Sequence, residues 1–203
     1  MQASFWIDPM CPWAWITSRW MVEVAKVRDV DVKWNIMSLG VLNEHNDVSE
    51  EYKKLIARTW RPARVLSRAR ELHGDEVVFP LFSALGTRFH VDKRKDMAAV
   101  IAESLAEVGL PAELAAAADD PQFDDLVRAN HATAVAMSGA GVGTPVIAID
   151  GLDGNPVGFF GPIITPIPRG EDAGRLWDGF VLVAQVPGVV EIKRARTLGP
   201  VVD

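Results

Sequence analysis

The stretch Ala3-Ser4-Phe5-Trp6-Ile7-Asp8-Pro9-Met10-Cys11-Pro12-Trp13-Ala14-Trp15 decides how the chain begins to fold. Its first five residues are mostly apolar or aromatic, as in a buried strand, and Asp8-Pro9 stops that run. From 12 to about 27 the apolar residues recur at helical spacing, and proline is well tolerated at a first helical position. The stretch therefore predicts a strand and a helix joined by a short turn that carries Cys11.

Beyond this helix, the patterning predicts the rest of an α/β fold. Residues 30–36 alternate between apolar and polar side chains, so a second strand follows, and the order strand, helix, strand implies a right-handed parallel crossover. Between about 49 and 138, one helical pattern follows another. Strand patterns return at 146–149 and 157–160, which predict an antiparallel hairpin, and a final helix is expected over about 169–184.

The composition excludes several classes of protein. The chain has 203 residues, of which 49% are hydrophobic, and a formal net charge of -6, which argues against a nucleic-acid partner. No run approaches the ~18 apolar residues of a membrane span, and the N-terminus lacks the pattern of a secretory signal. We therefore expect one compact cytoplasmic unit with neither a nucleic-acid nor a membrane partner.

Cys11 is the only cysteine in the sequence, so no disulfide can form within the chain. Any oxidative chemistry must then involve a second molecule. Most lone cysteines are buried structural residues. At a helix start, however, a thiol faces unpaired backbone N–H groups and the positive end of the helix dipole, which lower its pKa. The position of Cys11 thus favours a reactive thiol with a depressed pKa.

A proline opens the third predicted strand, within Val142-Gly143-Thr144-Pro145-Val146. Proline at the start of a strand removes no ladder hydrogen bond, so its place is sensible without any function. An X-Pro bond is also readily cis, and a cis turn would present the backbone of Thr144 to its neighbours. Combined with Cys11, this proline indicates thiol chemistry, and we expect a cis Thr144-Pro145 bond close to the cysteine.

Two other kinds of site are not indicated. His45, His73 and His131 have no metal-ligand spacing with Cys11, so we expect no metal. The glycines at 139, 141 and 143 precede a predicted strand, whereas a dinucleotide-binding fingerprint follows a strand and opens a helix. We therefore expect no nucleotide cofactor.

Six segments combine into a pattern of their own: Phe5-Trp6-Ile7-Asp8-Pro9-Met10-Cys11-Pro12-Trp13, Ile16-Thr17-Ser18-Arg19-Trp20, Val24-Ala25-Lys26-Val27-Arg28-Asp29, Met37-Ser38-Leu39, Phe160-Gly161-Pro162 and Ile167-Pro168-Arg169-Gly170-Glu171, with Gly143-Thr144-Pro145 before the hairpin. This pattern resembles the DsbA-like branch of the thioredoxin superfamily and, more narrowly, the actinobacterial mycothiol-dependent nitroreductase family. The resemblance covers nearly the whole chain. It implies an α/β, thioredoxin-like fold with a large all-helical insertion.

The same resemblance implies a division of the chain and an activity. Residues 1–45 and 139–203 would form the thioredoxin-like domain, and 46–138 the helical insertion. The activity would be that of a thiol-disulfide oxidoreductase that takes electrons from mycothiol or another low-molecular-weight thiol and reduces small electrophiles, with Cys11 as nucleophile. The residues that the resemblance assigns to the substrate and thiol pocket are Pro12, Trp13, Asn43, Tyr52, His90, Thr144 and Pro145.

The chain departs from the family pattern at position 14. Better-known members have Cys-Pro-Trp-Cys, whereas this chain has alanine at position 14. Ala14 is either the natural residue or a substitution made to trap an adduct on Cys11. Without a second thiol the internal disulfide cannot close, so we expect a monothiol cycle in which a small thiol releases the adduct on Cys11. Two alternatives stay open: a glutathione-transferase-like or isomerase-like enzyme that only positions a thiol cofactor, and a non-catalytic binding protein on the same fold.

Overall fold

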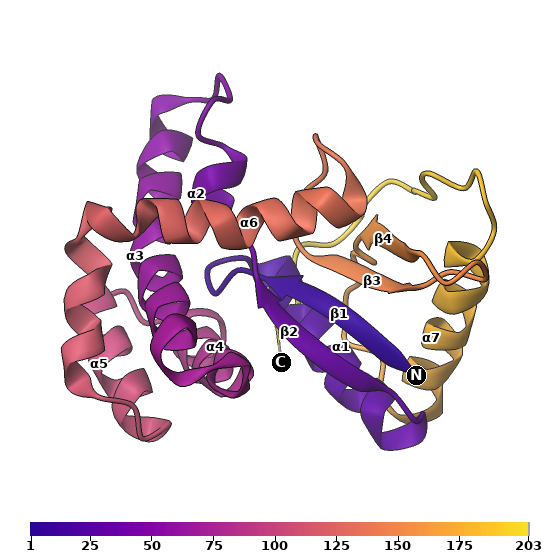
Figure 1. The fold of residues 1–203 in the computed structure, drawn as a ribbon, viewed down its shortest axis with the longest axis horizontal. Coiled ribbons are helices and arrows are strands. Elements are labelled where there is room, and N and C mark those ends of the chain that lie inside the picture. The colour runs from indigo at the N-terminus through magenta and orange to yellow at the C-terminus, as the bar shows by residue number, and fades with distance from the viewer. Residues whose placement is uncertain (203) are drawn as a thin grey trace.

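The computed structural model describes residues 1–202 and contains one four-stranded mixed sheet with the strand order β2-β1-β3-β4 (Figure 1). β1 (Gln2–Ile7) pairs in parallel with β2 (Asp31–Ile36). β3 (Val146–Asp150) runs antiparallel to β1 and forms a hairpin with β4 (Pro156–Phe160). The parallel pairing of the first two strands and the hairpin are therefore confirmed, and β1 and β3 form the centre of the sheet.

Helices cover both faces of this sheet. On one face, α1 (Pro12–Val27) packs beside α7 (Gly170–Ala184), and the buried indole of Trp20 donates a hydrogen bond of 3.1 Å to the Ala173 carbonyl. On the other face lies α6 (Asp124–Ser138), to which β1 is joined by a 2.7 Å hydrogen bond from Trp6 Nε1 to Thr133 Oγ1. Alternate residues of β1 thus face different helices, as the period of a strand requires.

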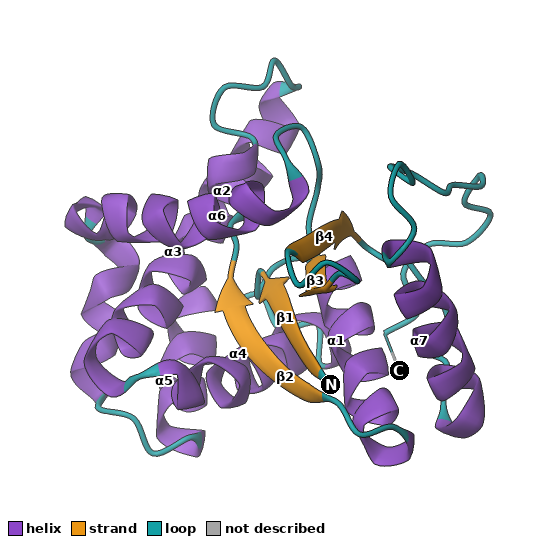
Figure 2. Cartoon of the chain, turned by 45° about the vertical axis from the view of Figure 1, so that its right-hand side comes forward, coloured by secondary structure: helices purple, strands orange, loops and turns teal. Residues whose placement is uncertain are grey.

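The remaining helices gather at one end of the sheet (Figure 2). They follow one another in the chain between the end of β2 and the start of α6, and three 3-10 helices lie among them, at Asp75–Val77, Ala112–Asp119 and Pro121–Phe123. A π-helical turn at Thr87–Val91 extends the helix before it. The α-helices of this part are α2 (Leu39–Leu42), α3 (Glu50–His73), α4 (Val78–Gly86) and α5 (Met97–Glu107). All four strands lie outside 46–138, and the division at those residues stays our prediction.

The C-terminal tail, residues 185–202, returns to α1 without forming a helix or strand (Figure 1). Trp15 Nε1 donates a 3.2 Å hydrogen bond to the Val202 carbonyl, and the guanidinium carbon of Arg196 lies 5.2 Å from the centre of the Trp13 ring. Thr165 fixes the same segment through its hydroxyl, which contacts the backbone at 199 and 201. The tail therefore lies against the end of α1 that carries Cys11. Among the described residues, no helix is long and apolar enough to span a bilayer.

Candidate active site

Cys11 occupies the N-cap of α1, at the junction that the sequence predicts. Its sulfur accepts a hydrogen bond from the Ala14 N–H at 3.4 Å, and its own backbone N–H donates to the Asp8 carbonyl at 3.1 Å. Pro12, at the first helical position, has no N–H to satisfy. The cysteine side chain is 3% exposed, so the turn and the helix enclose it almost completely.

The turn before β3 closes the site from the other side. The Thr144-Pro145 peptide bond is cis, as predicted. The Cys11 thiol donates to the Thr144 carbonyl with a sulfur–oxygen distance of 3.6 Å, although 133 residues separate the two in the chain. The Thr144 hydroxyl is buried and has no hydrogen-bond partner among the described residues. A strand start and a helix start thus meet at one sulfur atom.

A cavity of about 230 Å³ opens beside Cys11. One side is the cysteine turn, and the other is the start of α2 together with the first turns of α3. None of its lining side chains carries a formal charge, so the cavity suits a neutral, aromatic or apolar group better than an ion. The lining residues are Met10, Cys11, Pro12, Trp13, Leu39, Tyr52, Leu55, Ile56 and Thr59.

The residues assigned by resemblance occupy different places around this cavity. Pro12, Trp13 and Tyr52 line it with Cys11. Asn43, which follows the last residue of α2, does not line it; its amide donates a 2.9 Å hydrogen bond to the carbonyl of Leu39, the first residue of that helix.

His90 also lies outside the lining, behind the cysteine turn. Its Nε2 is 2.9 Å from the Pro9 carbonyl, and its ring centre is 5.9 Å from that of Trp15. Burial lowers the pKa of His90, so the ring is neutral and its Nε2–H can donate to Pro9. The π-helical turn thus brings a histidine to the backbone two residues before the cysteine.

Burial dominates the electrostatics of the thiol. The pKa of Cys11 is raised to about 12, mainly because burial removes water from the thiol; the hydrogen bond from Ala14 N–H lowers the pKa, and the charge of Asp8 contributes to the rise. The predicted depressed pKa is therefore wrong for this structure. The helix start does contact the sulfur, but one N–H at 3.4 Å does not offset nearly complete desolvation. The thiol is protonated at neutral pH.

The sequence interpretation missed Asp8 and the residues of α3 that face the cavity. Asp8 is fully buried, and burial raises the pKa of its carboxyl group to about 6. The signal for Asp8 is its place three residues before the cysteine, where the strand pattern stops. Leu55, Ile56 and Thr59 share one side of α3 at helical spacing, but nothing in the pattern said which partner that side contacts.

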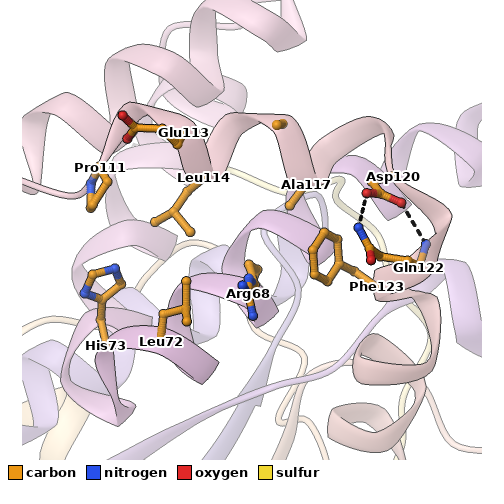
Figure 3. Close-up of a pocket in the computed structure, with 11 residues that line it drawn as sticks. Arg68, Leu72, His73, Pro111, Glu113, Leu114, Ala117, Asp120, Gln122 and Phe123 are labelled. Atoms are coloured by element: carbon orange, nitrogen blue, oxygen red, sulfur yellow. Dashed lines mark hydrogen bonds between the residues drawn. The ribbon is translucent and has the colours of Figure 1, made fainter.

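A second cavity, of about 310 Å³, lies away from the cysteine between α3 and the 3-10 helix at Ala112–Asp119 (Figure 3). Arg68 at its floor pairs with Glu71 and lies 5.3 Å from the ring centre of Phe123. Its lining contains no thiol. Within residues 1–202 there is also no group of three or more His, Cys, Asp or Glu side chains that could hold a metal ion. The candidate active site is therefore the Cys11 cavity.

A cysteine at the N-cap of the first helix, facing a cis-proline turn at the start of a central strand, defines a thiol oxidoreductase of the DsbA-like branch of the thioredoxin superfamily. Residues 10–194 match the model of the Rv2466c-like family, described as mycothiol-dependent nitroreductase Rv2466c. The chain belongs to this family and, like it, is a thiol-dependent oxidoreductase. Its predicted fold class is likewise confirmed.

A relative and several solved structures are similar to this chain, and the solved structures share its fold. The protein Rv2286c of Mycobacterium tuberculosis is 30% identical over 196 residues, which are 96% of this chain and 82% of that protein. The cytosolic disulfide reductase DsbM of Pseudomonas aeruginosa has a TM-score of 0.54 at 18% identity, over 90% of this chain and 99% of DsbM. DsbM has also been solved with GSH, with a TM-score of 0.51 at 16% identity over 90% and 100% of the two chains. A probable DsbA oxidoreductase of Streptomyces coelicolor has a TM-score of 0.57 at 18% identity, over 97% and 94%.

Proposed function

We propose that this protein is a cytoplasmic, mycothiol-dependent reductase of small electrophiles, such as nitro compounds and low-molecular-weight disulfides, with Cys11 as its nucleophile. The observation that carries the proposal is the sulfur of Cys11, held between the Ala14 N–H and the Thr144 carbonyl at the wall of an uncharged cavity. Family membership supports mycothiol as the reducing thiol, and the GSH complex of DsbM supports the class of small thiols.

With a disulfide as substrate, the cycle needs only one protein thiol. The Cys11 thiol loses its proton, the thiolate attacks one substrate sulfur, and the substrate S–S bond breaks to release a thiolate that takes up a proton. The product is a mixed disulfide on Cys11. A second small thiol, as its thiolate, then attacks the sulfur of the bound thiol, so that a small-molecule disulfide leaves and Cys11 is regenerated.

With a nitro compound, two small thiols supply the two electrons of the first reduction. The balanced step converts the nitro group and two thiols into a nitroso group, one disulfide and one water. Cys11 would carry one of these thiols as a mixed disulfide, which the second thiol releases. Ala14 cannot take the place of this second thiol, so external thiol is needed in every turnover.

The surrounding residues divide into two roles in this proposal. Trp13 and Tyr52 would pack against the electrophile in the cavity. The Ala14 N–H would stabilise the thiolate, and Thr144 with Pro145 would present backbone groups to the bound thiol. Pro12, Asn43 and His90 would hold the walls of this site rather than react.

The experiment that tests this function uses intact mass. Incubation with oxidised mycothiol should add one mycothiol moiety to the protein, because attack on the disulfide can occur while internal resolution cannot. Excess reduced mycothiol should then remove the adduct. A protein that forms no adduct under conditions in which it turns over nitro compounds would overturn the assignment of Cys11.

A transferase-like or isomerase-like enzyme is the second candidate, favoured by one observation. The Cys11 thiol is protonated at neutral pH because burial raises its pKa, which suits a residue that only donates a hydrogen bond to a cofactor thiol. Under this candidate, Cys11→Ser should keep much of the activity, since a hydroxyl can donate the same bond. Under the nucleophile proposal, that variant is inactive.

A further inference from the structure

Asp8 is a buried carboxylate beside the reactive cysteine. Its side chain is completely enclosed, and among the described residues no Lys, Arg or His forms an ion pair with it. A buried charge without a counterion is destabilising, so it is usually retained for its hydrogen bonds or its field.

The two carboxylate oxygens of Asp8 bind two segments that are far apart in the chain. Oδ1 accepts the Met10 N–H at 2.7 Å, and Oδ2 accepts the Leu39 N–H at 2.6 Å. The first bond is a local turn of a kind common for aspartate. The second spans 31 residues and reaches the first residue of α2. Met10 and Leu39 both line the Cys11 cavity, so one carboxylate joins its two walls.

The charge of Asp8 also acts on the sulfur. It raises the pKa of the Cys11 thiol beyond the effect of burial. Two other titratable groups face this turn: His90, bonded to the Pro9 carbonyl, and His131 of α6, whose Nδ1 accepts the Ser38 N–H at 3.3 Å. Burial lowers the pKa of both histidines, so neither supplies a positive charge that would cancel Asp8 at neutral pH.

We propose that Asp8 is a positioning residue for the reaction of Cys11, because its carboxylate holds the two walls of the cavity together and its charge lies in the same turn as the sulfur, where the Cys11 N–H donates to the Asp8 carbonyl. This inference rests on the proposed role of Cys11 as nucleophile. Asp8 takes no part in bond making. It sets the distance between the cysteine turn and α2, and its negative charge disfavours the thiolate of Cys11.

The test is the rate of Cys11 alkylation by iodoacetamide as a function of pH. Thiolate concentration rises tenfold per pH unit below the thiol pKa, so the logarithm of the rate should rise with unit slope. Asp8 ionises near pH 6, and its charge then makes the thiolate less favourable. Above this pH the logarithm of the rate should again rise with unit slope, but along a line about three- to tenfold lower than the one followed below pH 6. A straight line from pH 5 to 8 in the unmodified protein would overturn the proposal.

Asp8→Asn sharpens the test, because it keeps the shape of the side chain but removes the charge and one acceptor. The drop in the rate profile near pH 6, called the step below, should disappear in this variant. Alkylation at pH 8 should be about three- to tenfold faster than in the wild type. The KM for a small disulfide should rise at the same time, since the Leu39 and Met10 N–H groups no longer share two oxygens. If Asp8→Asn does not fold, the pH profile of alkylation of the wild-type protein still tests the proposal.

Asp96→Asn is the matched control. Asp96 is also an acceptor for a backbone N–H, that of Ala99 at 3.1 Å at the start of α5, and it does not line the cavity. This variant should lose stability but keep the step. His90→Gln and His131→Asn should also keep it, and a step that vanishes in either would assign it to a histidine instead. Alkylation measures the Cys11 thiol directly, so these results do not depend on turnover. A Cys11→Ser enzyme that remains active would therefore reject the proposed function of Cys11 but not the effect of Asp8 on the thiol.

Discussion

Two cavities of the described residues differ in volume, in charge and in the backbone around them, and their comparison shows which of these properties identifies the candidate site. The larger one, about 310 Å³, lies within the helical part and is bordered by Arg68, His73 and Glu113. The smaller one, about 230 Å³, has no charged side chain in its lining, yet it contains Cys11. Volume and charge would identify the larger cavity as the active site. The contact between the start of α1 and the cis-proline turn identifies the smaller one instead. The candidate site is therefore identified by the backbone geometry that holds the Cys11 sulfur, and not by the size of the cavity.

The largest expected effect is the loss of turnover in Cys11→Ser. The hydroxyl is a far weaker nucleophile than a thiolate, so reduction should fall to the uncatalysed rate and no mixed disulfide should form. Steady-state rates with mycothiol and a nitroaromatic substrate measure this. Phe123→Leu, in the larger cavity, is the matched control and should stay within about twofold of the wild-type rate.

Ala14→Cys should change the fate of the adduct on Cys11. The N–H of residue 14 is 3.4 Å from the sulfur, and the Ala14 side chain is fully buried in the same turn. A thiol there should attack the mixed disulfide, and the small thiol should leave as an internal disulfide forms. Intact mass follows the loss of the small thiol. An Ala14→Cys adduct as long-lived as the wild-type one would show that position 14 cannot reach the sulfur.

A smaller effect is expected from the aromatic wall of the cavity. Trp13→Ala removes a ring that lines the cavity beside Cys11, and stacking plus burial of such a ring contributes about 1–2 kcal/mol. The KM for an aromatic substrate should therefore rise about tenfold, with less change for an aliphatic disulfide. Equal losses with both substrates would argue that Trp13 only supports the fold.

The smallest effect concerns the C-terminal tail. Arg196→Ala removes the guanidinium that lies 5.2 Å from the ring centre of Trp13. Exposed cation–π contacts are weak, so the KM should rise by only about two- to threefold. Arg194→Ala is the control from the same exposed segment and should leave the KM unchanged. An Arg194 effect equal to that of Arg196 would assign the change to general charge rather than to the contact with Trp13.

The parts of the site that depend on local backbone were predictable from the sequence. Cys11 at a helix N-cap follows from a strand pattern, a proline and a helical pattern in succession, and the cis-proline turn follows from Thr144-Pro145 at a strand start. The strands follow from apolar runs bounded by turn residues and from the alternation at 30–36, and α1 follows from a period of 3.6 residues. Each of these features is encoded within about ten neighbouring residues.

The features that depend on docking were not predictable in the same way. The pKa direction for Cys11 was wrong because it depends on water being excluded by the turn, by α3 and by the Thr144 strand, which come from distant parts of the chain. Asp8 was missed for the same reason, because its contact with Leu39 spans 31 residues. The sequence predicts which side of α3 is apolar, but it does not predict that this side packs toward the Cys11 cavity.

The place of Trp13 gives this site an optical signal of its own. The indole forms part of the cavity wall next to the sulfur, and nitroaromatic groups and disulfides both quench indole emission on contact. Trp20, by contrast, is fully buried against α7 and at a hydrogen-bonding distance from Ala173, away from any bound electrophile. Emission that falls on substrate binding and recovers on release would therefore report the state of Cys11 in real time, and Trp13→Phe would remove that response.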